Sequence, residues 1–244
     1  MLESARLQRV LVVGLGGLGC PVAAILARAP GVELVLCDDD VVDATNLHRQ
    51  VLYRESDVGH DKLTAAKAAL VAAGAEAERI TLVRSRLLPD NAVELIRSVD
   101  LVIEGADNFA TKFLAADAAH LAGRPIVHGA AIRFVGTAWA VSATGAPCYR
   151  CWFEDVPPGA QLGCSEAGVM GPVVGFCGAL MADLALRVLA GDASAFGSLY
   201  TYDGQRDSLR QISASARPQC PLCGPSPTIT QILEARYTTP SCAA

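Results

Sequence analysis

The sequence has 244 residues and a formal net charge of −5 at pH 7. This mildly acidic balance argues against nucleic acid as the main partner, because proteins that bind nucleic acids usually carry clustered positive charge. Hydrophobic residues make up 52% of the chain and aromatic residues only 5%, which predicts a core of Ala, Val and Leu suited to an α/β sheet. We expect residues 1–244 to form a single domain.

The first residues lead directly into a strand pattern and show no targeting signal. The longest uncharged apolar run, residues 167–182, contains Pro172 and stops at Asp183, so it is shorter than the about 20 residues of a membrane-spanning helix. We therefore expect a cytoplasmic protein without a membrane partner. In that compartment the nine cysteines are expected to be thiols or metal ligands rather than disulfides.

The stretch 9–62 predicts a βαβ unit with a phosphate-binding turn. Its apolar run 10–13 predicts a strand buried on both faces, and residues 18–29 and 33–37 predict the next helix and strand. A GxGxxG turn with one extra glycine stands between the first strand and the helix: Gly14, Gly16, Gly17 and Gly19. Without Cβ atoms these residues let a phosphate approach the amides at the helix start.

Polar residues after the second strand distinguish two nucleotide chemistries. Asp38 lies at the strand tip, about 20 residues beyond the glycines, where a carboxylate can accept hydrogen bonds from ribose hydroxyls. It is followed by Asp40, Asn46, Arg49 and Lys62. Phosphoryl and adenylyl transfer need cations that converge on phosphate, because negative charge builds on its oxygens in the transition state. Each cation alone could be an ordinary surface charge, but together they favour transfer chemistry over hydride transfer.

Helices and strands alternate along the rest of the chain. Further helices are predicted over residues 62–73, 89–98, 109–121 and 173–190. Further strands are predicted over residues 80–87, 101–104, 125–131 and 135–141, with a hairpin over 198–202 and 209–213. This order predicts an α/β fold with a doubly wound, mostly parallel, Rossmann-like sheet that antiparallel strands extend. Its parts are a nucleotide-binding unit (9–141), a cysteine-containing loop (145–171) and a C-terminal unit (172–223).

Asp107 follows the predicted strand 101–104, so we expect it at the same edge of the sheet as Asp38. The alternative is that Asp107 and Asn108 cap the helix that begins at Phe109, because both residue types are common caps. Capping and metal binding are compatible with each other.

Two C-x-x-C pairs are widely separated in the sequence: Cys148, Cys151, Cys220 and Cys223. Each pair presents two thiolates on a tight turn, and two such turns complete a tetrahedral zinc site with no open position. A closed site is structural and would pin the C-terminal hairpin to the end of the sheet. The alternatives are a redox pair or unpaired buried thiols, although neither pair stands at a helix start as in thioredoxins.

Cys164 stands alone in the loop, ahead of a predicted helix. A thiol near a helix N-terminus ionises more easily and is a better nucleophile, which makes Cys164 a candidate catalytic residue. The alternative is a cysteine that merely lies in a loop. Cys20, Cys37 and Cys177 fall within apolar patterns and are predicted to be core residues.

The motifs and their order along the chain resemble those of the ThiF/MoeB/HesA family, which is related to ubiquitin-activating enzymes. The matching segments are GLGGLG at 14–19, the pair Asp38 and Asp40, NLHRQ at 46–50, VGHDK ending at Lys62, GADNF at 105–109, both C-x-x-C pairs, and CSEAGVMGPVVG from Cys164. The resemblance extends from about Arg9 to Cys223 and identifies the chain as a single ThiF-type adenylation domain.

The resemblance implies an ATP-dependent adenylyltransferase that acts on a small ubiquitin-like sulfur carrier protein ending in Gly-Gly. The carrier's terminal carboxylate would attack the α-phosphate of Mg·ATP, in preparation for thiocarboxylate formation in thiamine, molybdopterin or related cofactor biosynthesis. A homodimer, and a cysteine desulfurase or rhodanese as sulfur donor, are also implied. The roles carried over are phosphate binding by Gly17 and the glycine-turn amides, ribose binding by Asp38, charge stabilisation by Arg49 and Lys62, Mg²⁺ binding by Asp107 and acyl transfer by Cys164.

Two features depart from the family pattern. Lys112 stands where an arginine is usual. Family members usually begin with an additional helical segment whose arginine reaches the neighbouring subunit's ATP site, whereas here only eight residues precede Arg9. The alternatives are that Arg6 takes this role, that the start of the chain was assigned too late, or that the enzyme handles ATP differently.

Three other functions are compatible with parts of the sequence. The chain could be a ThiF-like enzyme that adenylates a peptide or a small carboxylate. It could be a relative that binds a ubiquitin-like protein without catalysis. An NAD-linked oxidoreductase would explain the glycine turn and Asp38, but it would leave Arg49, Lys62 and the cysteine pairs without a role.

Overall fold

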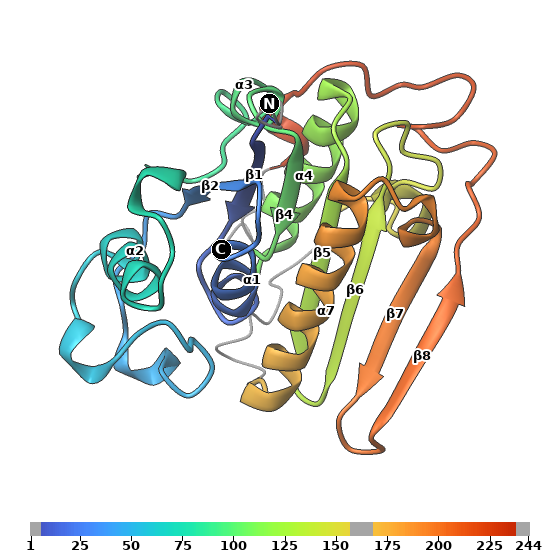
Figure 1. Ribbon diagram of the computed structural model, residues 1–244. Coiled ribbons are helices and arrows are strands. Elements are labelled where there is room, and N and C mark those ends of the chain that lie inside the picture. Colours follow the sequence, from blue (N-terminus) through green and yellow to red (C-terminus); the bar gives the residue numbers. More distant parts are fainter. Residues whose placement is uncertain (1–5, 157–167, 238–244) are drawn as a thin grey trace, which may run out of the picture.

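The computed structural model describes residues 6–156 and 168–237, which build one eight-stranded sheet with helices on both faces (Figure 1). The strands are β1 (Gln8–Val13), β2 (Val32–Cys37), β3 (Ile80–Val83), β4 (Leu101–Glu104), β5 (Ile126–Ile132), β6 (Val135–Val141), β7 (Ser198–Asp203) and β8 (Ser208–Ser213). The helices are α1 (Gly19–Leu26), α2 (Lys62–Ala72), α3 (Ala92–Arg97), α4 (Phe109–Ala122), α5 (Tyr149–Trp152) and α7 (Gly171–Leu189). The predicted α/β fold is confirmed.

The strands follow the spatial order β3-β2-β1-β4-β5-β6-β7-β8. In the parallel half, β1 pairs with β2 in the register Val13↔Cys37 and with β4 in the register Val13↔Glu104. From β5 onward the strands are antiparallel. The chain order therefore reverses around β1, and the carboxyl ends of β2, β1 and β4 meet at one edge. In α/β sheets this switch point is where ligands bind.

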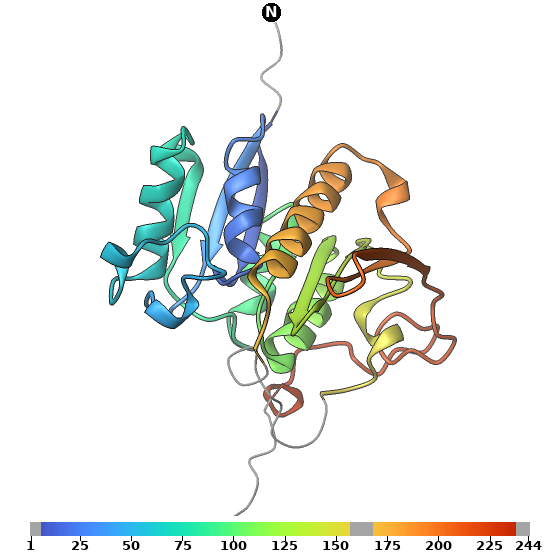
Figure 2. The same ribbon diagram turned by 90° about the horizontal axis from the view of Figure 1, so that it is seen from below.

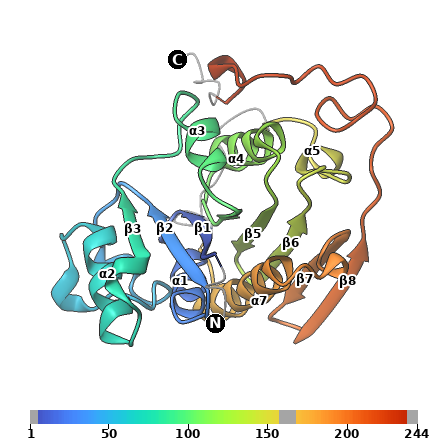
Figure 3. The ribbon, with the colours of Figure 1, turned by 45° about the horizontal axis from the view of Figure 1, so that its top comes forward.

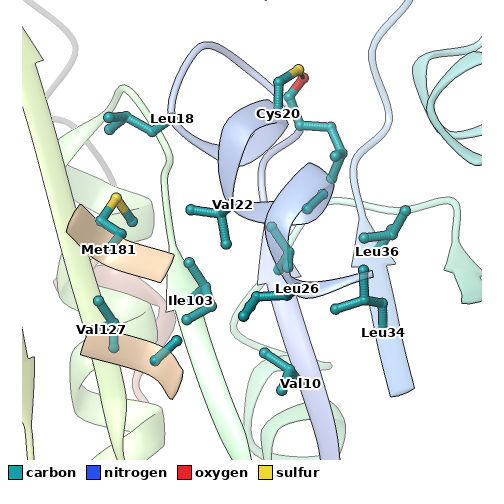
Figure 4. Close-up of a cluster of buried hydrophobic side chains, with 14 of the residues drawn as sticks. Val10, Leu18, Cys20, Val22, Leu26, Leu34, Leu36, Ile103, Val127 and Met181 are labelled. Atoms are coloured by element: carbon teal, nitrogen blue, oxygen red, sulfur yellow. Dashed lines mark hydrogen bonds between the residues drawn. The ribbon is translucent and has the colours of Figure 1, made fainter. Parts of the chain in front are cut away.

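Apolar helices cover each face of the sheet. The helices α1, α2 and α7 lie on one face, and α3, α4 and α5 lie on the other (Figure 3). On the first face, α1 packs its side chains Val22 and Leu26 against β1 and its neighbours through Val10, Leu34 and Ile103 (Figure 4). Because both faces are covered, the central strands carry runs of consecutive buried apolar residues, Val10–Val13 in β1 and Leu101–Ile103 in β4, as the sequence predicted.

The helix α7 runs beside α1 and across the start of the antiparallel half (Figure 2, α1 in blue and α7 in orange). It approaches the sheet closely at two glycines. A Cβ at Gly129 of β5 would lie 2.1 Å from Met181 Sδ, and one at Gly136 of β6 would lie 2.1 Å from Cys177 Sγ. Glycine at both positions therefore allows the helix backbone to settle onto the sheet.

By length and composition, α7 is apolar enough to cross a membrane, since its helix continues past Asp183 to Leu189. The expectation from the sequence counted only the uncharged run before Asp183, and it therefore underestimated the length of the apolar helix. In the fold, the apolar side of α7 is used inside the protein: Val173, Val174, Cys177, Met181 and Leu184 are buried in the core. Packing on the sheet accounts for its hydrophobicity.

The strand predicted over residues 80–87 is shorter than expected, because β3 ends at Val83. Among residues 6–156 and 168–237 its only neighbouring strand is β2, and their last paired residues are Cys37 and Val83. Beyond that point no strand of the described chain pairs with β3, and the chain turns so that the amide of Ser85 donates to the carbonyl of Val83.

Candidate nucleotide site and cysteine cluster

The glycine turn closes β1 and opens α1 at the switch point of the sheet. Gly14 has a φ of +86°, a conformation that favours glycine. A Cβ at Gly19 would lie 1.9 Å from the carbonyl oxygen of Gly14, so no larger residue fits where the helix crosses the strand end. No side-chain hydrogen bond caps Leu18 at the start of α1. Within α1, the Cys20 amide donates to the carbonyl of Gly16 at 3.0 Å and Pro21 has no amide hydrogen. The candidates for anion binding are therefore the amides of the glycine turn just ahead of the helix.

Asp38 ties the tip of β2 to the glycine turn. Its Oδ2 accepts a hydrogen bond from the amide of Leu15 at 2.6 Å, and its Oδ1 accepts one from the amide of Asp40 at 2.8 Å. Each carboxylate oxygen has two lone pairs, so both retain capacity for another donor. The side chain that the sequence assigned to ribose thus lies directly beside the turn assigned to phosphate.

Lys62 begins α2 and is buried next to the same turn. Its side chain is 6% exposed and its Nζ lies 2.9 Å from Asp40 Oδ2, which provides the counter-charge that a buried ammonium requires. The thiol of Cys20, on α1, is near enough to be affected by this cation. Burial raises the pKa of Cys20 to about 12, while Lys62 acts in the opposite direction. Cys20 is therefore a neutral core residue, as predicted.

Arg49 lies along the glycine turn from the other side. A Cβ at Gly17 would lie 3.4 Å from Arg49 Cγ and 2.6 Å from Val174 Cγ1 of α7, so the absence of a side chain at Gly17 makes room for both. The guanidinium Nη2 of Arg49 donates to Asn46 Oδ1 at 2.6 Å. The structure therefore places Arg49 against Gly17, with Asn46 bound to its guanidinium, and Lys62 close to Cys20 of α1.

Asp107 follows β4 on the opposite flank of β1 from Asp38. The peptide just ahead of it contacts the glycine turn, because a Cβ at Gly14 would lie 3.5 Å from the amide nitrogen of Ala106. The N-cap of α4 is Asn108, whose Oδ1 accepts a hydrogen bond from the amide of Thr111 at 2.8 Å. Asn108 thus performs the capping considered for the pair, and Asp107 is exposed.

Sequence reasoning missed a buried cluster beneath this edge, formed by Glu104, Lys112 and His128. Lys112 Nζ lies 3.0 Å from Glu104 Oε2, and His128 Nδ1 lies 3.2 Å from the same oxygen. Burial opposes ionisation of Glu104, but Lys112 and His128 hold its pKa below the ordinary value; burial lowers the pKa of His128. The one signal in the sequence was a glutamate that ends an otherwise apolar strand.

Gln50 was also left without a role, although it belongs to the NLHRQ segment. Its side chain is buried, and its Nε2 would be 3.8 Å from a Cβ at Gly16. Its Oε1 has no hydrogen-bond partner among the described residues. Nearby, the hydroxyl of Tyr53 donates to the carbonyl of Leu15 at 2.9 Å. Gln50 thus lies close to the glycine turn, and Tyr53 is hydrogen-bonded to it.

Arg6 lies at the other end of the sheet from the glycine turn within its own chain. It precedes β1, and its Nη2 is 2.6 Å from Asp100 Oδ1, just ahead of β4. Cys164 lies outside the described residues.

The four cysteines of the two C-x-x-C pairs converge in space. The distance between the Cys148 and Cys220 sulfurs is 3.4 Å, between those of Cys151 and Cys223 it is 3.5 Å, and all four lie within 4.8 Å of one another. A tetrahedral zinc ion with Zn–S bonds of about 2.3 Å requires sulfur–sulfur separations of about 3.8 Å. The amide of Arg217 also donates to Cys151 Sγ at 3.3 Å. The donor set therefore fits a structural metal.

A buried ion pair supports the first cysteine turn. Within α5, Arg150 donates from Nη2 to Asp117 Oδ2 of α4 at 2.8 Å, and both side chains are almost fully buried. The hydroxyl of Tyr237 donates to the same oxygen at 2.8 Å. This contact joins the cysteine loop, α4 and the end of the described chain.

The chain resembles known proteins along nearly its whole length. A model described as "ThiF family" matches residues 2–222. The chain is 42% identical to "Adenylyltransferase and sulfurtransferase MOCS3" of Mus musculus over 226 residues, which is 91% of this chain and 49% of that protein. It is 40% identical to "Sulfur carrier protein adenylyltransferase" of Thermus thermophilus over 238 residues, which is 94% of this chain and 88% of that protein. The chain thus spans about half the length of the mouse relative.

Solved structures of Escherichia coli MccB have the same fold. The complex titled "Crystal structure of E. coli MccB + ATP" gives a TM-score of 0.72 at 20% sequence identity, covering 89% of this chain and 66% of that one. The complex of MccB with MccA-N7isoASN gives a TM-score of 0.77 at 20% identity, covering 89% and 67% of the two chains. At this identity the likeness extends to the fold alone. The family match over residues 2–222 and the close relatives decide the assignment: this chain belongs to the ThiF family.

Proposed function

We propose that the chain adenylates the C-terminal glycine of a small ubiquitin-like sulfur carrier protein, using Mg·ATP. The observation that carries this proposal is the position of two cations in a chain whose close relatives are named as adenylyltransferases: Arg49 lies against Gly17, and Lys62 lies between Asp40 and Cys20. The carrier's terminal carboxylate attacks the α-phosphorus of ATP, and the bond from that phosphorus to the pyrophosphate oxygen breaks. No general base is needed, because the carboxylate is already ionised at neutral pH.

Each residue at the switch point has a physical task in this reaction. The amides of the glycine turn receive the phosphates, and Asp38 accepts from the ribose hydroxyls. Arg49 and Lys62 stabilise the charge that builds on the phosphate oxygens. For Lys62 this requires its ammonium to exchange part of its contact with Asp40 for phosphate.

Asp107 is the proposed ligand of Mg²⁺. Its carboxylate is exposed at the carboxyl end of β4, and it does not cap α4, because Asn108 does so. Magnesium prefers oxygen ligands and commonly uses one or two carboxylates together with phosphates and water, which fits this position. When bound, the ion would neutralise the phosphates and orient the pyrophosphate leaving group.

The cysteine cluster is the proposed structural zinc site. Four thiolates leave no open coordination position, so zinc would supply cross-linking rather than catalysis. After adenylation, a persulfide from a cysteine desulfurase or rhodanese, or the thiolate of Cys164, attacks the acyl carbon and releases AMP. This branch would serve thiamine, molybdopterin or a related sulfur-containing cofactor. The protein is proposed to act as a homodimer in the cytoplasm.

ATP–pyrophosphate exchange tests the activity directly. The protein is incubated with Mg·ATP, labelled pyrophosphate and a small carrier that ends in Gly-Gly, and exchange is expected only when the intact carrier is present. A carrier without its last glycine is the matched control. Exchange with short peptides or small carboxylates, but not with the carrier, would instead make the chain a ThiF-like enzyme of another pathway. ATP binding without exchange on any substrate would indicate a non-catalytic relative.

A further inference from the structure

The proposed reaction leaves the buried charge cluster of Glu104, Lys112 and His128 unused. Their side chains are 0%, 9% and 2% exposed, respectively. The three residues come from the end of β4, the first half of α4 and the middle of β5. A cluster of this kind needs a reason, because a buried ion pair is often no more stabilising than apolar side chains of the same volume.

Glu104 is the centre of the cluster and is bonded on both oxygens. Oε1 accepts from Lys112 Nζ at 3.1 Å and from the amide of Ala106 at 2.7 Å. Oε2 accepts from Lys112 Nζ at 3.0 Å and contacts His128 Nδ1 at 3.2 Å. Because a carboxylate can only accept, we assign the proton of His128 to Nδ1. Lys112 Nζ also donates to the carbonyl of Gly129 at 2.6 Å, which fixes its position from β5.

The bond from Ala106 connects this cluster to the nucleotide site. Ala106 immediately precedes Asp107, and the same peptide lies against Gly14 of the glycine turn. Apolar side chains could fill the space of the cluster, but none could accept the Ala106 hydrogen bond. The charge at Glu104 is therefore placed where it fixes the backbone that carries Asp107.

We propose that Glu104, held by Lys112 and His128, is a positioning residue that sets the direction of the Asp107 carboxylate toward the metal-bound triphosphate. This inference rests on the proposed function. In this proposal the three residues of the cluster contact neither the nucleotide nor the metal. The cluster affects the Mg²⁺ requirement of the reaction, and it does not affect binding of the nucleoside part of ATP.

The test compares two buried carboxylates on the same face of the sheet. Glu104→Gln removes the charge next to Ala106, and Asp117→Asn removes an equally buried charge paired with Arg150. Both are expected to lower the melting temperature. Only Glu104→Gln is expected to raise the Mg²⁺ concentration for half-maximal ATP–pyrophosphate exchange, by about tenfold or more, because small displacements of a catalytic group are costly. Calorimetric binding of AMP without metal is expected to stay at the wild-type affinity in both.

Lys112 provides a second pair of variants in case Glu104→Gln does not fold. Lys112→Met is expected to raise the Mg²⁺ requirement, and Lys112→Arg, which keeps a cation with several donors, is expected to restore it. An unchanged Mg²⁺ requirement in Lys112→Met, or an equal rise in Asp117→Asn, would overturn the positioning role. If the wild-type protein itself failed to bind Mg·ATP, the proposed function would be refuted and this inference would fall with it.

Discussion

Asp107 and Asn108 are adjacent residues with different partners. The Asn108 side chain accepts a hydrogen bond from the helix backbone, whereas Asp107 is exposed beside the glycine turn. Asp107→Ala is therefore expected to abolish ATP–pyrophosphate exchange and to leave the melting temperature unchanged. Asn108→Ala is expected to keep exchange and to lose about 1 kcal/mol of stability, the usual cost of a missing N-cap. Exchange that survived in Asp107→Ala would remove that residue from the mechanism.

His128 makes the stability of the protein depend on pH. Burial lowers its pKa below the ordinary 6.5, with Lys112 acting in the same direction and Glu104 opposing. The unfolded chain therefore binds a proton at this residue more readily than the folded one, so the free energy of unfolding decreases as pH falls below 6.5. Chemical denaturation at several pH values above 4.5, the ordinary pKa of glutamate, measures this effect together with that of His120, whose pKa burial also lowers.

His128→Asn is expected to reduce the slope of the free energy of unfolding against pH, because no group then titrates at this position. His60→Asn, at an exposed residue, is the matched control and should keep the wild-type slope. Equal slopes in the wild type and the His128 variant would show that another group is responsible.

At the level of elements, the glycine turn and α7 pack closely against each other. A methyl group at Gly17 would lie 2.6 Å from Val174 Cγ1, so Gly17→Ala forces one of the two elements to move. The expected loss of stability is about 1–3 kcal/mol, as for other overpacked sites, together with weaker ATP binding. The double variant Gly17→Ala/Val174→Ala should recover part of both. A double-mutant cycle in urea measures the coupling, and additive losses would contradict the contact.

Much of the parallel half could be predicted from the sequence, because strands buried on both faces are continuous apolar runs and their carboxyl ends meet at one edge. That reasoning placed Asp38 and Asp107 at the same edge of the sheet. The end of β3 could not be predicted, since it depends on where β2 stops. The link between Glu104 and His128 was also hidden, because the two residues are 24 positions apart and glutamate is usually found at the surface.

Across the whole molecule, the cysteine cluster connects the segment after β6 with the segment after β8. Zinc bound there would cross-link residues 72 positions apart in the sequence, and its binding free energy would add to folding. One zinc per chain is therefore expected by elemental analysis. A strong chelator, or Cys220→Ser, should lower the melting temperature and expose the C-terminal segment to proteases. Cys177→Ser changes a buried cysteine outside the cluster and should leave the zinc content intact.

The first residue of α7 also touches the loop that carries Arg49. A Cβ at Gly171 would lie 2.5 Å from the carbonyl oxygen of His48, so there is no slack between the two segments. A displacement of α7 toward this loop would therefore press on the backbone next to Arg49. A side chain at Gly171, as in Gly171→Ala, would have to move one of the two segments, so the position of the arginine depends on where α7 begins.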